Sequence, residues 1–159
     1  DRQKLERVIP AAYSGERTEA RLEAYAEDMA RKVRLSYPTQ VLGRLIETDD
    51  KFKLPADQAE TVTLLRQAAA KGFRLGETPV AAFLKAHADV RGDMNDTEFQ
   101  AAGRQLKVLQ SVYQITPSNE AMPVLARLGI TSAFDVMAYS EESFIELYTT
   151  AYKEIYDQA

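Results

Sequence analysis

The only histidine of the 159-residue sequence is His87, so any acid–base or nucleophilic chemistry that needs an imidazole depends on it. A Ser-His-Asp triad would have to be built around this residue, but its neighbours Lys85 and Asp89 belong to no nucleophile elbow. Cysteine is absent, which excludes thiolate nucleophiles and disulfides. We therefore interpret His87 as a residue near the C-terminal end of a helix, where the helix dipole favours a cation.

Adjacent carboxylates are the second candidate for chemistry, because two facing acids can hydrolyse a glycosidic bond. Neighbouring residues on a helix point in different directions, however, and acids in a first helical turn are explained by the helix dipole. We therefore predict no catalytic dyad among the three acidic pairs, which are Glu27–Asp28, Asp49–Asp50 and Glu141–Glu142.

Metal and cofactor sites have no recognisable pattern in the sequence. One histidine and no cysteine give no zinc motif, and no calcium-loop spacing occurs. The segment MNDTEF (94–99) holds two carboxylates, which we interpret as the N-terminal cap of a helix. The seven glycines are scattered singly, so there is no phosphate-binding loop. We predict no metal site, no cofactor and no enzymatic activity.

The segment LARLGITSAFDVMAYSEESFIEL (125–147) is similar to one half of a helix-hairpin-helix DNA-binding unit. Such a unit needs basic residues beside the phosphates, whereas the net charge of the chain is −4 and carboxylates surround the turn. We expect a structural helical hairpin and no nucleic-acid partner. A nucleic-acid module built on residues 128–133 remains the less favoured alternative.

Tyr148, Tyr152 and Tyr156 are spaced four apart and form an aromatic stripe on the last helix, with Phe144 nearby. Two interpretations are open: the stripe is a platform on which a ligand stacks, or it packs on the core or on sequence beyond residue 159. We favour packing, because tyrosine is amphipathic and common at such contacts.

The elements that must position these residues are helices. Apolar residues recur at helical spacing, and no segment alternates as a strand does between hairpin turns. With 45% hydrophobic and 28% charged residues, the composition is that of a globular protein. We predict an all-α, irregular bundle of about eight helices that forms a single domain, residues 1–159. A soft division near residue 92, into 1–92 and 93–159, is left open.

The first clear helix is predicted over residues 18–35. Its outer face pairs Glu27 with Arg31 and Asp28 with Lys32. Its buried stripe consists of six apolar residues, namely Leu22, Tyr25, Ala26, Met29, Ala30 and Val33. A second helix follows over residues 38–47.

Proline, glycine and capping residues predict the later helix boundaries. Pro55 opens a helix that Gly72 ends, with an inner face of Ala59, Val62, Leu65 and Ala69. Further caps are Thr78 with Pro79 at the first helical position, Thr131, and Ser140. The helix over residues 95–114 is the candidate central packing element, with Gly103 allowing a neighbouring backbone to approach. Pro123 is expected to kink a short helix or delay its start to Met122.

No run of eighteen apolar residues occurs, and the N-terminal residues lack the apolar region of a signal peptide. We therefore expect no direct membrane insertion by this segment. The chain begins with Asp1 and ends inside an amphipathic pattern, so we interpret both ends as cuts in a larger chain.

Three phrases together resemble the N-terminal helical shell region of the Tc (ABC-type) insecticidal toxin A component. They are EAYAEDMARKVRLSYPTQVLGRLIE, KGFRLGETPVAAFLKAH and LKVLQSVYQITPSNEAMPVLARLGITSAFDVMAYSEESFIELY. They occur in the family's order and cover most of the chain, and the third is the most specific.

The resemblance implies a secreted or cell-surface bacterial toxin complex, in which large A subunits form a homopentamer around a translocation channel. For this segment it implies a structural, non-catalytic role, with other domains of the same chain as partners. No catalytic residue of the family corresponds to a position here. The alternative is a stand-alone helical protein-interaction domain.

Overall fold

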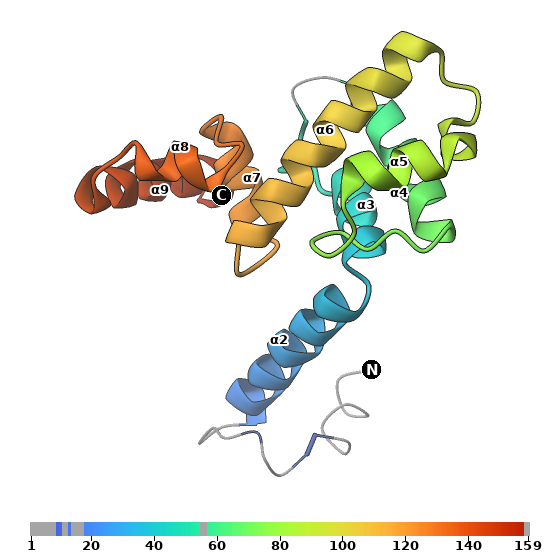
Figure 1. Cartoon of the computed structure of the whole chain (residues 1–159). Coiled ribbons are helices and arrows are strands. Elements are labelled where there is room, and N and C mark those ends of the chain that lie inside the picture. The colour runs from blue at the N-terminus through green and yellow to red at the C-terminus, as the bar shows by residue number, and fades with distance from the viewer. Residues whose placement is uncertain (1–8, 11–12, 14–17, 55–56, 158–159) are drawn as a thin grey trace. The chain divides into compact units, whose positions relative to one another are not determined.

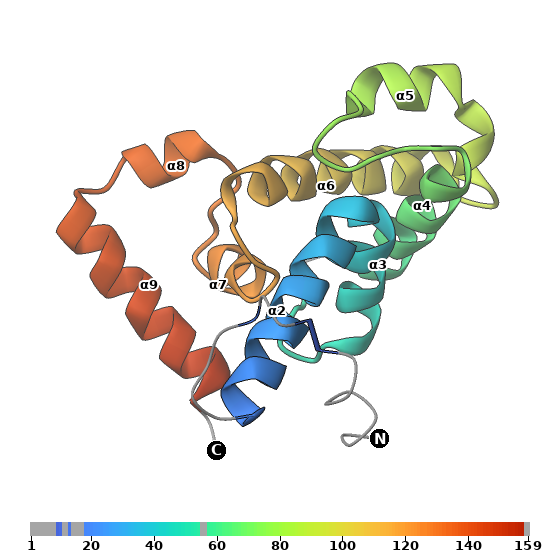
Figure 2. The same cartoon turned by 90° about the horizontal axis from the view of Figure 1, so that it is seen from below.

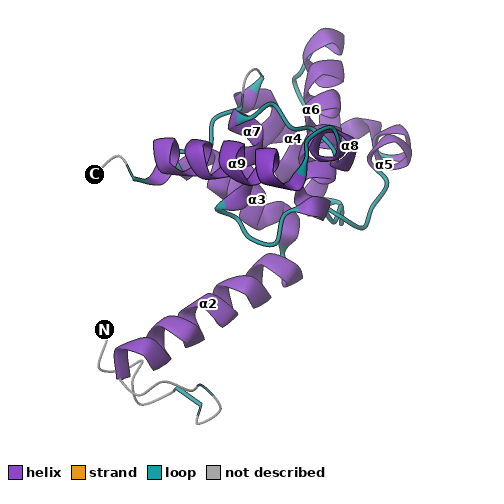
Figure 3. Cartoon of the chain, turned by 90° about the vertical axis from the view of Figure 1, so that its left-hand side faces the viewer, coloured by secondary structure: helices purple, strands orange, loops and turns teal. Residues whose placement is uncertain are grey.

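The computed structural model describes residues 9–10, 13, 18–54 and 57–157. Within these residues the protein has eight α-helices, one short 3₁₀ helix and no strand (Figure 3). The predicted all-α class with about eight helices is therefore confirmed. Apolar side chains at helical spacing place one stripe of each helix on a common face, which is what lets such helices pack together.

The chain divides into two units between Tyr37 and Pro38. The described part of the first unit is mainly α2 (Thr18–Ser36). On its surface, Lys32 Nζ lies 2.7 Å from Asp28 Oδ2, as the i, i+4 spacing predicts.

The apolar stripe of α2, predicted to be buried, is largely exposed. Leu22 and Tyr25 are half-buried, and the Tyr25 ring meets the Tyr13 ring edge to face. Met29 and Val33 are 40% and 46% exposed. Among the described residues of the first unit, α2 is the only helix, so its stripe has no second helix of that unit to pack against. The predicted burial is therefore wrong for most of the stripe.

Three helices form the core of the second unit: α3 (Pro38–Thr48), α4 (Gln58–Ala70) and α6 (Asp96–Ile115) (Figure 1). α4 packs against both α3 and α6. Leu64 on α4 and Leu106 on α6 are completely buried. The helix predicted over residues 95–114 corresponds to α6 and is a central packing element. α4 is a second one.

The buried face of α4 is wider than its predicted inner face. Val62 and Leu65 are buried as expected, but Leu64 and Ala68 are buried too, and Ala59 is exposed. A helix between two neighbours buries more of its circumference than one stripe. The width of the buried face of α4 therefore depends on packing against both α3 and α6, which the spacing of apolar residues does not predict.

Residue 92 lies inside the second unit, Pro38–Ala159. α5 (Val80–Ala86) and η1 (Ala88–Arg91) precede it and pack on α6 and α4, respectively. Gly92 has φ +56°, and a Cβ at this position would lie 2.6 Å from the Gln67 side-chain nitrogen. The helices on both sides of residue 92 share one core, and the two compact units meet at Tyr37 and Pro38. The single domain over residues 1–159 stays a prediction.

The ends of α4 and α6 follow their predicted chemistry. Gly72 has φ +87°, and the Phe73 amide donates to the Ala68 carbonyl at 2.9 Å, which is the Schellman arrangement. At the start of α6, the Asn95 side chain accepts from the Glu98 amide, and the Glu98 carboxylate accepts from the Asn95 amide. This reciprocal capping box confirms the cap expected in MNDTEF.

At other positions the observed caps and contacts differ from the predicted ones. α5 begins at Val80, with Pro79 as its N-cap residue, while the Thr78 hydroxyl accepts from a loop amide. A Cβ on Gly103 would meet the side chain of Leu84 at 3.2 Å, so a side chain approaches there and not a backbone. α4 begins at Gln58, and the predicted start at Pro55 lies outside the described residues.

Candidate functional site

α7 (Ala121–Arg127), α8 (Ala133–Met137) and α9 (Glu141–Tyr156) form one end of the second unit (Figure 2). α7 packs against α6 and α9, and α8 packs against α6. Pro123 is the third residue of α7, which begins at Ala121 and not at Met122. The amide of a third helical residue has no partner within the helix, so a proline is tolerated there.

A groove of about 510 Å³ opens among the C-terminal end of α6, α7, α8 and the first half of α9. Its lining is almost entirely apolar and includes Ile115, Pro117, Leu125, Met137, Ile145 and Tyr148. Leu125 is buried, whereas Met137 and Ile145 are 78% and 56% exposed. The groove therefore has a packed interior and an exposed apolar rim.

The predicted aromatic stripe forms and contributes to this groove. Ring centroids of Tyr139, Phe144, Tyr148, Tyr152 and Tyr156 follow one another at 6.3, 6.1, 6.4 and 4.7 Å. Phe144 and Tyr148 pack against the hydrophobic core and line the groove. This part of the stripe packs on the core, as the favoured interpretation holds, and the same rings form one wall of the groove.

Tyr156, the last residue of α9, joins the C-terminal end of this helix to Glu120 and Lys51. Its hydroxyl donates to the Glu120 carbonyl at 3.1 Å, and Lys51 Nζ lies 4.5 Å from its ring centroid. Burial, followed by the nearby charges of Asp49 and Glu120, raises the pKa of Tyr156 to about 12. Burial also raises the pKa of Tyr148. The raised pKa of Tyr156 extends the pH range in which its hydroxyl is a hydrogen-bond donor.

The turn between α7 and α8 has amides that face Asp135. Ser132, and not the predicted Thr131, is the N-cap residue of α8. Asp135 Oδ2 accepts from the amides of Thr131 at 2.7 Å and of Ser132 at 3.0 Å. The hydrogen bonds from Thr131 contribute most to holding the pKa of Asp135 below its usual range. A helix-hairpin-helix unit would use such amides to bind phosphate, so the carboxylate opposes a nucleic-acid function for this turn.

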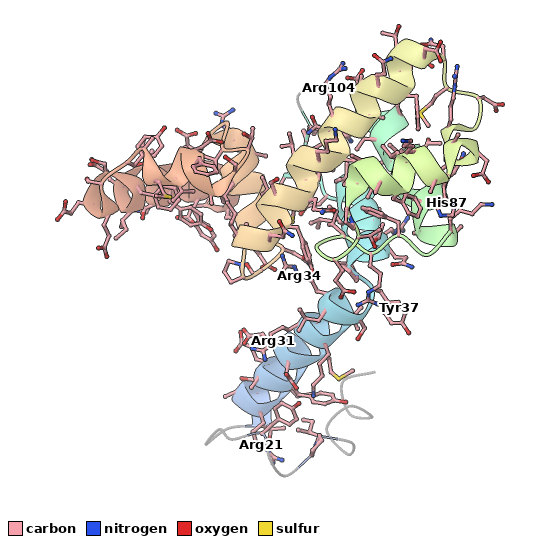
Figure 4. The ribbon with its side chains drawn as sticks, viewed as in Figure 1. Arg21, Arg31, Arg34, Tyr37, His87 and Arg104 are labelled. Carbon is pink, nitrogen blue, oxygen red and sulfur yellow. The ribbon has the colours of Figure 1, made fainter. Side chains whose placement is uncertain are left out.

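His87 lies at the C-terminal end of α5, as predicted (Figure 4). Its ring packs on Phe83, with the centroids 4.5 Å apart. The neighbouring Asp89 carboxylate lies 2.6 Å from Lys71 Nζ, which holds the pKa of Asp89 below its usual range. The geometry thus gives His87 a packing role and places it on a helix that does not line the groove.

The three acidic pairs lie on three different elements. Asp28 on α2 accepts from Lys32 and Tyr13, which lower its pKa in that order. Asp49 lies in the connection after α3, near Tyr156 at the end of α9. Glu141 and Glu142 lie in the first turn of α9, at its other end. Within the second unit, the α9 helix, about 24 Å long, therefore separates two of the pairs.

The sequence predicts the aromatic part of the groove lining and not its aliphatic part. The predicted aromatic stripe includes Tyr148 and Phe144, whereas the sequence pattern assigns no role to Met137, Ile145 or Ile115. A usable signal was the five-residue helix AFDVM, which has four apolar residues and is too short to bury all its sides. In the structure, α8 buries none of them.

Within the described residues, no three potential ligands among histidine, aspartate and glutamate side chains gather where they could hold a metal ion. None of the described helices combines the length and apolar character needed to cross a membrane.

The fold defines an all-α, multi-helix protein with an apolar groove at one end of its larger unit. Comparison with protein-family models, curated proteins and solved structures found no match to this chain. The likeness to the Tc toxin A component therefore depends on the three sequence phrases alone.

Proposed function

We propose that this chain is a non-catalytic helical scaffold segment whose groove binds an apolar helix of a neighbouring domain or protein. The exposure of Met137 and Ile145 on the rim of an apolar groove carries this proposal. Apolar side chains gathered beside a hollow of the same character are typical of docking sites. Burying them would contribute about 25 cal/mol per Å² of apolar surface, a stabilisation that the second unit alone does not obtain.

A helix suits the shape of the groove. The walls of the groove are helices, and its rim residues come from two of them, Met137 from α8 and Ile145 from α9. Grooves between helices bind amphipathic helices whose anchors are spaced i, i+3 or i+4, and i+7. The described residues contain no strand, so the groove offers no sheet edge to which a peptide strand could add.

We also propose, from the three phrases, that the segment belongs to the shell of a Tc toxin A-like subunit. Its partners would then be helices of the same large chain or of other copies in a pentamer, within a secreted or cell-surface toxin complex. The complete reading frame tests this: helical segments continuing on both sides support it. A reading frame only slightly longer than the present sequence would reject it.

A stand-alone helical interaction domain is the second candidate, because the same groove would serve it equally well. A short reading frame would favour this candidate over a toxin shell. In both cases the groove, and not a reactive centre, performs the function.

Binding of an uncharged helical peptide tests the groove directly. The probe is a peptide of about 18 residues with a leucine stripe and glutamine on its other faces, long enough to form a helix when bound. We expect binding by fluorescence anisotropy, weakened about tenfold by Met137→Ala combined with Ile145→Ala, since apolar contacts are lost.

Leu147→Ala is the matched control for that experiment. Leu147 is also a partly exposed apolar residue of α9, but it does not line the groove. Its substitution should change the affinity by less than about twofold. Equal losses in the control and in the groove variant would contradict the proposed site, as would no binding at all.

A further inference from the structure

The negative charge of the chain is concentrated in the segment that supplies the lining of the groove. Residues 108–152 contain five carboxylates and one cation, Arg127. This excess of four equals the net charge of the whole chain, −4, so the remaining residues are neutral as a group. Arg127 itself lies 3.2 Å from the Glu154 carboxylate. The five carboxylates belong to Glu120, Asp135, Glu141, Glu142 and Glu146.

Two of these carboxylates lie directly beside the apolar rim. Glu141 and Glu142 are exposed in the first turn of α9 and precede Ile145 by four and three residues. Residues at these spacings are neighbours on one face of a helix. In the described part of the chain, no lysine or arginine forms an ion pair with either carboxylate. Their charge is therefore available to a molecule that occupies the groove.

This charge distinguishes among the possible occupants of an apolar groove. An anionic membrane surface or a nucleic acid would be repelled, because each gains its affinity from lysine and arginine on the protein. A second copy docking through the same face would bring like charges together, which is also unfavourable. A helix with lysine or arginine beside its apolar stripe would gain both apolar contact and charge complementarity.

We propose that the groove binds a cationic amphipathic helix, whose apolar stripe packs on Met137 and Ile145 and whose flanking cations meet Glu141 and Glu142. This inference rests on the proposed function, because it names the chemical class of the segment that the same groove binds. The apolar stripe supplies most of the contact, and the cations decide which amphipathic helices are accepted.

Three synthetic peptides with one leucine stripe test the inference on the full chain. Their other faces carry lysine, glutamine or glutamate. We expect the affinities to fall in that order, with at least about a tenfold difference between the lysine and glutamate peptides at about 50 mM salt. At about 300 mM salt the difference should shrink, because exposed charges are screened over a shorter distance.

A double variant, Glu141→Gln with Glu142→Gln, locates the effect. It should weaken the lysine peptide about threefold to tenfold and leave the glutamine peptide unchanged. The matched control is Asp50→Asn with Asp93→Asn, which removes two exposed carboxylates of the same unit that lie in the α3–α4 and η1–α6 connections, away from the first turn of α9. The control should retain the full preference for lysine.

The outcomes separate this inference from the proposed function. Equal binding of the three peptides, or tighter binding of the glutamate peptide, would overturn the charge preference while the groove remained a docking site. Failure of all three, the glutamine peptide included, would overturn both. Dimerisation of the chain in light scattering, abolished by Met137→Ala with Ile145→Ala, would replace the cationic helix by a second copy as the occupant.

Discussion

The core and the α8–α9 end of the second unit use similar apolar residues in different ways. α4 buries five residues, including Leu64 and Leu65, because it lies against both α3 and α6. α8 has four apolar residues in five and buries none. The difference teaches that the number of neighbouring helices, and not composition, decides whether an apolar residue serves folding. The α8–α9 end keeps apolar surface that the fold of this unit does not need.

The largest expected effect lies in the core. Leu106→Ala removes a completely buried side chain from α6 and should lower the free energy of unfolding by about 2–5 kcal/mol. Urea denaturation followed by circular dichroism measures the change. A loss below about 1 kcal/mol would mean that the core tolerates a cavity there, and the contrast between the core and the α8–α9 end would disappear.

Two glycines that end helices should give effects of intermediate and similar size. Gly72 and Gly129 have φ +87° and +69°, and an added Cβ at either position would enter open space, with no atom within 4 Å beyond the glycine and its chain neighbours. Substitution by alanine therefore costs only the backbone strain, about 1–2 kcal/mol at each site. Equal losses by urea denaturation would show that helix ends contribute locally, whichever end of the unit they belong to.

Gly43→Ala is the control for those two variants. Gly43 lies inside α3, and an added Cβ would make an ordinary contact with Leu65 at 3.8 Å. Because alanine is the better helix former, this variant should be neutral or more stable by up to about 1 kcal/mol. A large loss here would indicate that added volume, and not backbone strain, explains the other two results.

Tyr156→Phe should have a smaller effect, about 0.5 kcal/mol, since the hydrogen bond to the Glu120 carbonyl is exposed to solvent. The raised pKa of Tyr156, about 12, favours the protonated phenol in the folded state. Its contribution is complete below the unfolded pKa of about 10 and is lost as the pH rises through about 12. In a spectrophotometric titration, the variant should lack one late-titrating tyrosine.

Met137→Ala should have the smallest effect on stability, within about 0.5 kcal/mol, because the side chain is mostly exposed. Combined with the peptide measurement, it sharpens the comparison most: the same variant should weaken binding while leaving unfolding unchanged. A loss of stability comparable to that of Leu106→Ala would show that Met137 belongs to the core, and the groove would then lose its exposed rim.

Local chemistry made several helix ends predictable from sequence. The Asn95 box needs only residues three apart, and the Gly72 end needs only a residue that accepts a positive φ. Where two local solutions compete, prediction was less exact: Thr131 and Ser132 both bond to Asp135, and Ser132 is the N-cap residue. These errors of one residue left the helices themselves correctly predicted.

The groove and the unit boundary were not predictable in the same way. The spacing of the tyrosines identifies Tyr148. Ile145 and Ile115 belong to different helices, however, and line one groove only because α6 and α9 are packed in the same unit. The boundary at Pro38 likewise depends on which helices contact one another, and no proline or glycine pattern distinguishes it from residue 92.

The sequence by itself determined the all-α class, most of the helix ends and the concentration of negative charge between residues 108 and 152, because these depend on residue type and on short spacings. Only the tertiary structure decided which apolar stripes are buried. Burial requires a neighbour, and a neighbour is set by contacts between residues far apart in the chain. Val33 and Met137 therefore stay exposed, although their residue types match those that form the core.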